Sequence, residues 1–107
     1  KMMAKVKDVS YEEICDRATE VVFRLKQDGK IIESVTIGPL FMEIEYKDNE
    51  NSEIEKSTVP YAAWGIDGKK TYIHASKAVK DYLGKRYSIL MAGDYIVISK
   101  RETQTTK

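Results

Sequence analysis

Two short apolar runs near the C-terminus, joined by Gly93-Asp94, constrain the fold more than any other feature of the sequence. Residues 86–92 and 95–100 are rich in β-branched and aromatic side chains, and a two-residue loop that begins with glycine suits a type II′ hairpin turn. Such a hairpin pairs Ala92 with Tyr95 and Leu90 with Val97 on one face, and Met91 with Ile96 and Ile89 with Ile98 on the other. Both faces are then apolar, so each must be covered by another part of the chain, a partner or a ligand.

A long amphipathic helix is predicted over residues 10–28. Ser10 and Glu13 have the spacing of a capping box, and Gly29 follows where a left-handed C-cap residue would lie. Apolar residues recur at intervals of three and four, as one stripe of a helix requires: Ile14, Ala18, Val21, Val22 and Leu25.

The segments between helix and hairpin predict further strands. Strands are expected over residues 30–37, 40–47, 54–59 and 70–75, and Ser76 is expected to cap a short helix that ends at Gly84. In the second of these strands Leu40, Met42, Ile44 and Tyr46 alternate with polar residues. The fold class is therefore α+β: a mostly antiparallel sheet of five to six strands, with one long N-terminal helix and one short helix. We expect one domain over residues 1–107, with residues 1–8 and 102–107 flexible.

Composition excludes several classes of protein. No stretch approaches the ~18 consecutive apolar residues of a membrane-spanning helix, so we expect no membrane partner. A lone cysteine, Cys15, is typical of a reducing compartment, so we expect a cytoplasmic location. With His74 as the single histidine, a standard structural zinc site is excluded and we expect no bound metal. Little Asn and Gln beside abundant Lys, Glu and Ile is compatible with a thermophilic source.

Motifs of common enzyme classes are absent from the sequence. It contains no Gly-rich phosphate loop, no dinucleotide-binding fingerprint and no nucleophile elbow. His74 is expected to be a partly buried residue of strand 70–75, and Cys15 a small hydrophobe beside the helix stripe. We therefore expect a non-enzymatic protein that uses no cofactor.

An acidic cluster leaves one catalytic or metal-binding alternative open. Alternation places Glu43 and Glu45 on one face of a strand, and Glu53 and Glu55 are expected on its hairpin partner. Clustered carboxylates can bind a divalent cation or form an acid/base pair. The favoured interpretation is a solvated face that also discourages pairing between sheet edges.

The small net charge of +1 conceals an uneven distribution along the chain. Residues 41–66 contain two basic and six acidic side chains, whereas residues 67–107 contain nine basic and four acidic ones. Six of the ten aromatic residues lie in or beside the basic part: Tyr61, Trp64, Tyr72, Tyr82, Tyr87 and Tyr95. Basic side chains that neutralise phosphates, interleaved with rings that stack on bases, are typical of nucleic-acid binding.

We therefore predict a protein that binds single-stranded DNA or RNA, or duplex DNA, through its C-terminal half. The predicted phosphate contacts are Lys69, Lys70, Lys77, Lys80, Lys85, Arg86 and Arg101, and the predicted stacking residues are Trp64, Tyr72 and Tyr87. The same tyrosines could instead line the core, and the same lysines could be a solubilising surface. The alternative function is a protein-interaction or assembly module with a bipolar charged surface and an apolar sheet face.

A homodimer is also expected. Two helices, one of them short, cannot easily cover both faces of a sheet of five or six strands. The second face needs a partner subunit, a ligand, or residues 60–68 folded across it.

Residues 71–84, followed by the hairpin, resemble the AbrB/MazE family of swapped-hairpin DNA-binding proteins. The shared order is a strand, a short helix that ends Leu83-Gly84, and a hairpin, over about a quarter of the chain. The sequence departs from the family pattern at Ala75-Ser76, where the family usually has proline, and nothing upstream matches. The resemblance therefore implies DNA binding without assigning membership.

Overall fold

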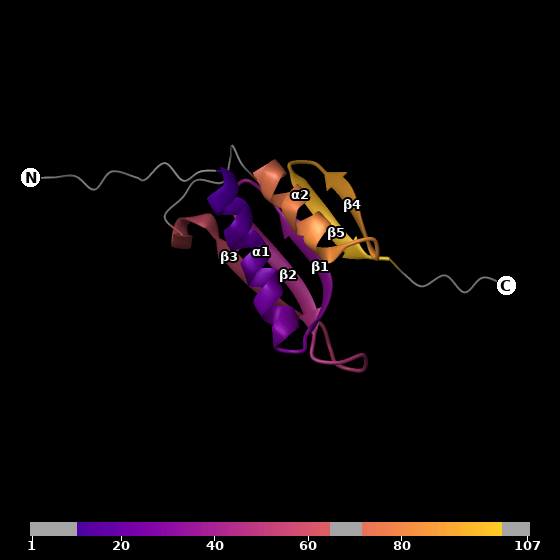
Figure 1. The fold of residues 1–107 in the computed structure, drawn as a ribbon. Coiled ribbons are helices and arrows are strands. Elements are labelled where there is room, and N and C mark those ends of the chain that lie inside the picture. The colour runs from indigo at the N-terminus through magenta and orange to yellow at the C-terminus, as the bar shows by residue number, and fades with distance from the viewer. Residues whose placement is uncertain (1–10, 65–71, 102–107) are drawn as a thin grey trace, which may run out of the picture.

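The structure, a computed structural model, describes residues 11–64 and 72–101. They form an antiparallel sheet of five strands with two helices packed on one face (Figure 1). The elements in chain order are α1 (Tyr11–Gln27), β1 (Ile31–Ile37), β2 (Phe41–Lys47), β3 (Glu55–Pro60), the 3-10 helix η1 (Tyr61–Trp64), α2 (Tyr72–Leu83), β4 (Tyr87–Ala92) and β5 (Tyr95–Lys100). The strand order is β3-β2-β1-β5-β4, so β1 is central and β3 and β4 are the edges. The α+β prediction is confirmed.

Helix α1 matches its prediction closely. Ile14, Ala18 and Val22 are buried at intervals of four, which places one stripe against the sheet. The helix ends in a Schellman motif: the Lys30 N–H donates to the Leu25 carbonyl and the Gly29 N–H to the Lys26 carbonyl, with Gly29 at φ 87°. Ser10 of the predicted capping box lies outside the described residues.

The core lies between the helices and one face of the sheet. Val35 of β1 pairs with Ile44 of β2 on one side and with Ile98 of β5 on the other, and all three side chains are fully buried. The alternation predicted for β2 is confirmed at Met42, Ile44 and Tyr46. Leu40 departs from it, because the residue precedes the strand and is exposed.

The C-terminal hairpin has the predicted register. All four expected pairs, from Ala92–Tyr95 to Ile89–Ile98, are present. Gly93 has φ 67°, and every described residue with positive φ is glycine, so Asp94 has negative φ. One positive φ at the first loop position is the pattern of a type II′ turn rather than type I′.

The strand predicted over residues 70–75 is wrong, because Tyr72–Ala75 form the first turn of α2. Ala75, Ser76, Val79 and Leu83 are buried on one stripe of this helix, so burial at helical spacing overrides the β propensity of the tyrosine and isoleucine before them. Ser76 is consequently not an N-cap: it is inside the helix, and its hydroxyl donates to the Ile73 carbonyl at 2.6 Å. His74 is exposed on α2 rather than partly buried in a strand.

The second face of the sheet is not covered by either helix (Figure 1). Residues 61–64 do not cover it, because Tyr61 is buried in the core under the helices and the Arg17 side chain of α1 donates to the Trp64 carbonyl at 3.1 Å. The rest of the predicted covering segment, residues 65–68, lies outside the described residues. The face carries Ser34 and Thr36 on β1, Glu43 and Glu45 on β2, Val97 on β5 and Leu90 on β4. The Phe41 and Tyr95 rings also lie on it, with their centroids 5.7 Å apart.

Two buried tyrosines differ in their hydrogen bonding. The Tyr87 hydroxyl donates to the Ile32 carbonyl at 2.7 Å, whereas the Tyr61 hydroxyl has no partner among the described residues. An unsatisfied buried hydroxyl costs about 1–3 kcal/mol. We therefore expect Tyr61→Phe to raise the free energy of unfolding by roughly 1 kcal/mol and Tyr87→Phe to lower it by roughly 1–2 kcal/mol, measured by urea denaturation.

The stability at alkaline pH provides a second test of the burial of the Tyr61 hydroxyl. Burial raises the pKa of Tyr61 from 10.0 to about 12, so the folded chain holds this proton more tightly than the unfolded chain. The part of the free energy of unfolding that depends on this proton is fully present below pH 10. It falls by roughly 2–3 kcal/mol as the pH rises to about 12. Tyr61→Phe should flatten this decline, and an unchanged decline would mean that the phenol is not buried.

Candidate functional site

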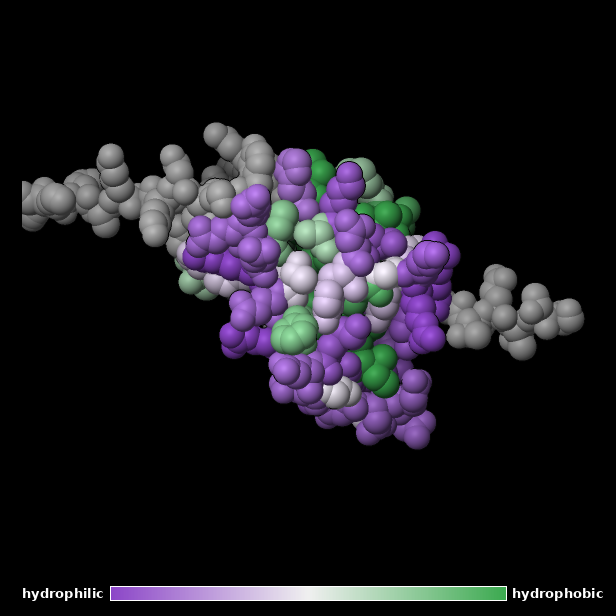
Figure 2. All heavy atoms as spheres, in the orientation of Figure 1, coloured by the Kyte–Doolittle hydropathy of each residue, from purple (hydrophilic) through white to green (hydrophobic). Residues whose placement is uncertain are grey.

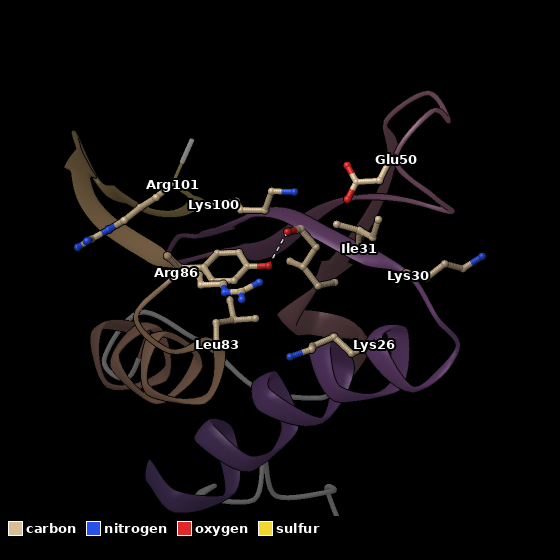
Figure 3. A pocket seen from close by; sticks show the side chains of 10 residues that line it. Lys26, Lys30, Ile31, Glu50, Leu83, Arg86, Lys100 and Arg101 are labelled. Carbon is tan, nitrogen blue, oxygen red and sulfur yellow. Dashed lines mark hydrogen bonds between the residues drawn. The ribbon is translucent and has the colours of Figure 1, made fainter. Parts of the chain in front are cut away.

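A hollow of about 970 Å³ lies at one end of the two-layer fold. The last turn of α1, the start of β1, the end of α2, the start of β4 and the end of β5 all meet there, and ten residues form its walls (Figure 3). Lys26, Lys30, Arg86, Lys100 and Arg101 provide five positive charges, and Glu50 provides one negative charge. The apolar floor is formed by Ile31, Ile32 and Leu83, with Tyr87 beside them.

The antiparallel order of the sheet explains why these cations meet. The start of β1 adjoins the end of β5, and the end of β5 adjoins the start of β4. This pairing brings Lys30 and Lys100 to the same end of the sheet, although they are about 70 positions apart in the chain. The last turn of α1 ends over the same region, which adds Lys26 where a cation also suits the helix dipole.

Two of the five cations have carboxylate partners. The Lys30 ammonium donates to Asp48, and this hydrogen bond raises the pKa of Lys30. The Lys100 ammonium donates to Glu33 at 3.3 Å. These ion pairs hold the two lysines in place at the rim but cancel part of their charge.

The other three cations have no ion pair among the described residues. Lys26 lies over the Tyr82 ring, with its ammonium 5.1 Å from the ring centroid. Arg86 and Arg101 lie on adjacent backbone segments, because the Arg101 N–H donates to the Arg86 carbonyl at 2.7 Å. Both side chains are exposed, so each guanidinium can bind an anion from outside.

The side chains do not all point the same way. In Figure 3 Arg86 and Lys26 extend into the hollow, whereas Lys30 and Arg101 point outward from its rim, and Glu33 holds the Lys100 ammonium at the rim. Burial raises the pKa of Tyr87, and the Glu33 charge adds to the effect, so the hydroxyl stays protonated at neutral pH. Its proton is already donated to the Ile32 carbonyl, which makes Tyr87 a rigid wall.

The predicted site residues are divided by the fold. Arg86, Arg101 and Tyr87 line the hollow, and Lys85 is exposed next to Arg86. Lys80 is half-buried and donates to the Gly84 carbonyl at 3.3 Å, while Lys77 is exposed on α2. Lys69 and Lys70 lie outside the described residues.

The predicted stacking rings do not lie together. Trp64 follows β3 and Tyr72 begins α2, so both are at the opposite end of the strands from the hollow, roughly 20 Å away for a seven-residue strand. Both are half-buried against the core, and the Trp64 ring packs on Tyr61 with centroids 5.6 Å apart. Tyr87 is at the hollow, but its ring is 8% exposed and is not available as a stacking surface.

Three basic residues of the hollow were missed by sequence reasoning: Lys26, Lys30 and Lys100. Lys26 and Lys30 belong to the N-terminal part of the chain, where basic and acidic residues balance. Only their positions could have indicated them: Lys26 lies in the last turn of the predicted helix 10–28, and Lys30 begins the predicted strand 30–37. The pairing of β1 with β5 that brings them to Arg86 joins distant segments, and no local pattern encodes it.

The acidic residues do not form one cluster, although Glu55 lies on β3, the hairpin partner of β2, as predicted. Glu43 and Glu45 lie opposite Thr58 and Lys56, whereas Glu55 lies opposite Tyr46 and therefore on the other face. Glu53 precedes β3. Across residues 11–64 and 72–101, no three His, Cys, Asp or Glu side chains are grouped to hold a metal ion.

Burial raises the pKa of the Cys15 thiol, with nearby Asp16 and Glu12 adding to the shift, so the thiol is protonated at neutral pH. Neither helix of the described chain has the length and apolarity needed to cross a lipid bilayer.

Comparisons with protein-family models, curated proteins and solved structures gave no match to this chain. The resemblance to the AbrB/MazE family is not supported, and the strand on which it depended is the first turn of α2. The hollow is therefore interpreted from its own geometry.

Proposed function

We propose that this protein binds nucleic acid by holding backbone phosphates in the basic hollow. The observation that supports the proposal is that five cationic residues line one hollow, three of them without an ion pair among the described residues, and that Lys26 and Arg86 extend into it. Phosphate oxygens satisfy such donors, and arginine binds them in a planar, bidentate geometry. The protein acts without catalysis and without a cofactor in this proposal, in the cytoplasm.

The arrangement favours contacts to phosphates over stacking on bases. Among the described residues, no exposed aromatic ring lines the hollow, because the Tyr82 ring lies under Lys26 and the Tyr87 ring is buried. Phosphate contacts position a nucleic acid without reading its sequence. The proposed binding is therefore weakly sequence-selective.

Binding should weaken steeply with salt. Three to five phosphate contacts predict a slope of log affinity against log salt of roughly −2 to −3.5 for a single strand, and about −3 to −4.5 for a duplex. Fluorescence anisotropy of labelled oligonucleotides over a salt series measures the slope. Trp64 fluorescence is a poor readout, because the indole lies at the far end of the sheet. Absence of binding at low salt would refute the proposal.

A protein-interaction or assembly module is the second candidate, and one specific observation favours it. Ile89, Leu90 and Met91 of β4 are 46%, 66% and 65% exposed, an apolar run at a sheet edge. Exposed apolar surface of this kind marks interaction sites. A homodimer is part of this second proposal.

A further inference from the structure

We propose that β4 pairs antiparallel with β4 of a second copy, which joins two five-stranded sheets into one continuous sheet. The inference goes beyond nucleic-acid binding and does not depend on it. It begins from the position of β4, which is an edge of the sheet with β5 as its neighbour on one side. A strand in this position presents unpaired backbone N–H and C=O groups on its free side.

The hairpin register identifies which backbone groups are free. Residues that flank a two-residue turn form a hydrogen-bonded pair, so Ala92, and by alternation Leu90, direct their N–H and C=O groups to β5. Ile89 and Met91 therefore direct theirs to the open edge. The Tyr87 N–H follows the same alternation, since it donates to the Gly84 carbonyl at 3.2 Å and not to β5.

The side chains of this edge lack the features that protect sheets from pairing. Residues 88–92 contain no charge and no proline, and the pairing with β5 runs without a bulge. The opposite edge, β3, carries Glu55 and Lys56 and ends at Pro60. Charged residues and proline are the usual devices against edge pairing, so the fold protects one edge and leaves the other open.

Apolar surface on both sides of the edge favours a strand as the occupant. Ile89 pairs with Ile98, which faces the helices, so Ile89 and Met91 project on the helix side. Leu90 pairs with Val97, which faces away from the helices, so Leu90 projects on the opposite side. Figure 2 shows hydrophobic surface at the corner formed by α2 and β4. A strand added to β4 would cover both sides at once, which a ligand bound to one face would not do.

A second copy fits this edge because the edge is complementary to itself. With a two-fold axis at Leu90, the open groups of Ile89 meet those of Met91 in the copy, and Met91 meets Ile89 in return. The two Leu90 side chains then lie opposite each other. An uncharged strand meets its copy without electrostatic repulsion.

The small contact area predicts a weak dimer. Pairing of two six-residue strands buries less than the roughly 1,200–2,000 Å² of a standard stable interface. We therefore expect a dimer that dissociates on dilution. In sedimentation velocity, the mass should rise from 12.2 kDa toward twice that value as the protein concentration increases.

A lysine introduced at either edge tests the location. Leu90→Lys places like charges opposite each other at the proposed axis and should weaken the dimer at least about tenfold. Thr58→Lys is the matched control, because Thr58 lies in the same cross-strand row at the other edge, opposite Glu43. Both positions are exposed, so both variants should fold, and circular dichroism checks this. Thr58→Lys should dimerise as the wild type does.

Amide hydrogen exchange measured by NMR provides a test without substitution. The Ile89 and Met91 amides should become protected as the protein concentration rises, whereas the Leu90 amide should be protected at every concentration. A monomer at millimolar concentration, or a dimer that survives Leu90→Lys, would overturn the proposal. Equal weakening by the two lysine variants would show that the open sheet face forms the contact, and would overturn it also.

Discussion

Replacing Ile98 with alanine is expected to lower the free energy of unfolding by about 2–5 kcal/mol. Ile98 is fully buried in β5, where it lies opposite Val35 of the central strand and Ile89 of the edge strand. Removal of three carbons there leaves a cavity beneath the helices that the packed core cannot fill. A domain of this size has roughly 5–15 kcal/mol of stability, so the loss is a large share of the total. Urea denaturation followed by circular dichroism measures it.

Val97→Ala is the matched control on the same strand. Val97 precedes Ile98 and points to the uncovered face, where it is half-buried between Thr36 and Leu90. The expected loss is about 1 kcal/mol or less, because less apolar area is removed from contact and water fills the gap. Equal losses at the two positions would contradict the assignment of one covered and one uncovered face.

Removal of two cations from the hollow should weaken nucleic-acid binding strongly. Lys26→Ala together with Arg86→Ala deletes two side chains that extend toward its middle (Figure 3). Each lost phosphate contact reduces the salt slope by about 0.7 for a single strand, so the affinity at 0.1 M salt should fall roughly 25-fold. Neither residue is in an ion pair among the described residues, so stability should change little. Anisotropy titration with a labelled single strand measures the effect.

An equal change of net charge elsewhere separates a defined site from diffuse attraction. Lys56→Ala with Lys77→Ala also removes two positive charges, from exposed positions on β3 and α2 that do not line the hollow. Lys77 was a predicted phosphate contact, so this variant also tests the sequence-based site. Its affinity should fall less than about threefold. Equal losses in the two double variants would show that net charge alone governs binding.

Local patterns predicted most of the fold. The Gly93-Asp94 turn defined the register of the C-terminal hairpin, and the stripe from Ile14 to Leu25 defined α1, because turn chemistry and helical period act over a few residues. The wrong prediction of a strand over residues 70–75 also came from a local pattern. Tyr72 and Ile73 favour strands locally, but Ala75 and Val79 are buried against the sheet only if the segment is helical.

The candidate site was predicted less completely, for a different reason. Arg86 and Arg101 were visible as part of a basic region, but Lys26 and Lys30 join them only because β1 pairs with β5 across a long stretch of chain. Aromatic rings and basic side chains that are close in the sequence are also separated in the structure. Trp64 lies at the other end of the strands, a distance that charge and aromatic counts cannot reveal.

The most direct test of the proposed function is a map of where an oligonucleotide binds. In an NMR titration of the wild-type protein with a short single strand, the largest amide shift changes should fall at the hollow, at residues 26, 86, 87, 100 and 101. Trp64 and Tyr72 should change little. Saturable changes centred on the hollow would support phosphate binding there. Changes centred on Trp64 and Tyr72, or no change at low salt, would contradict it.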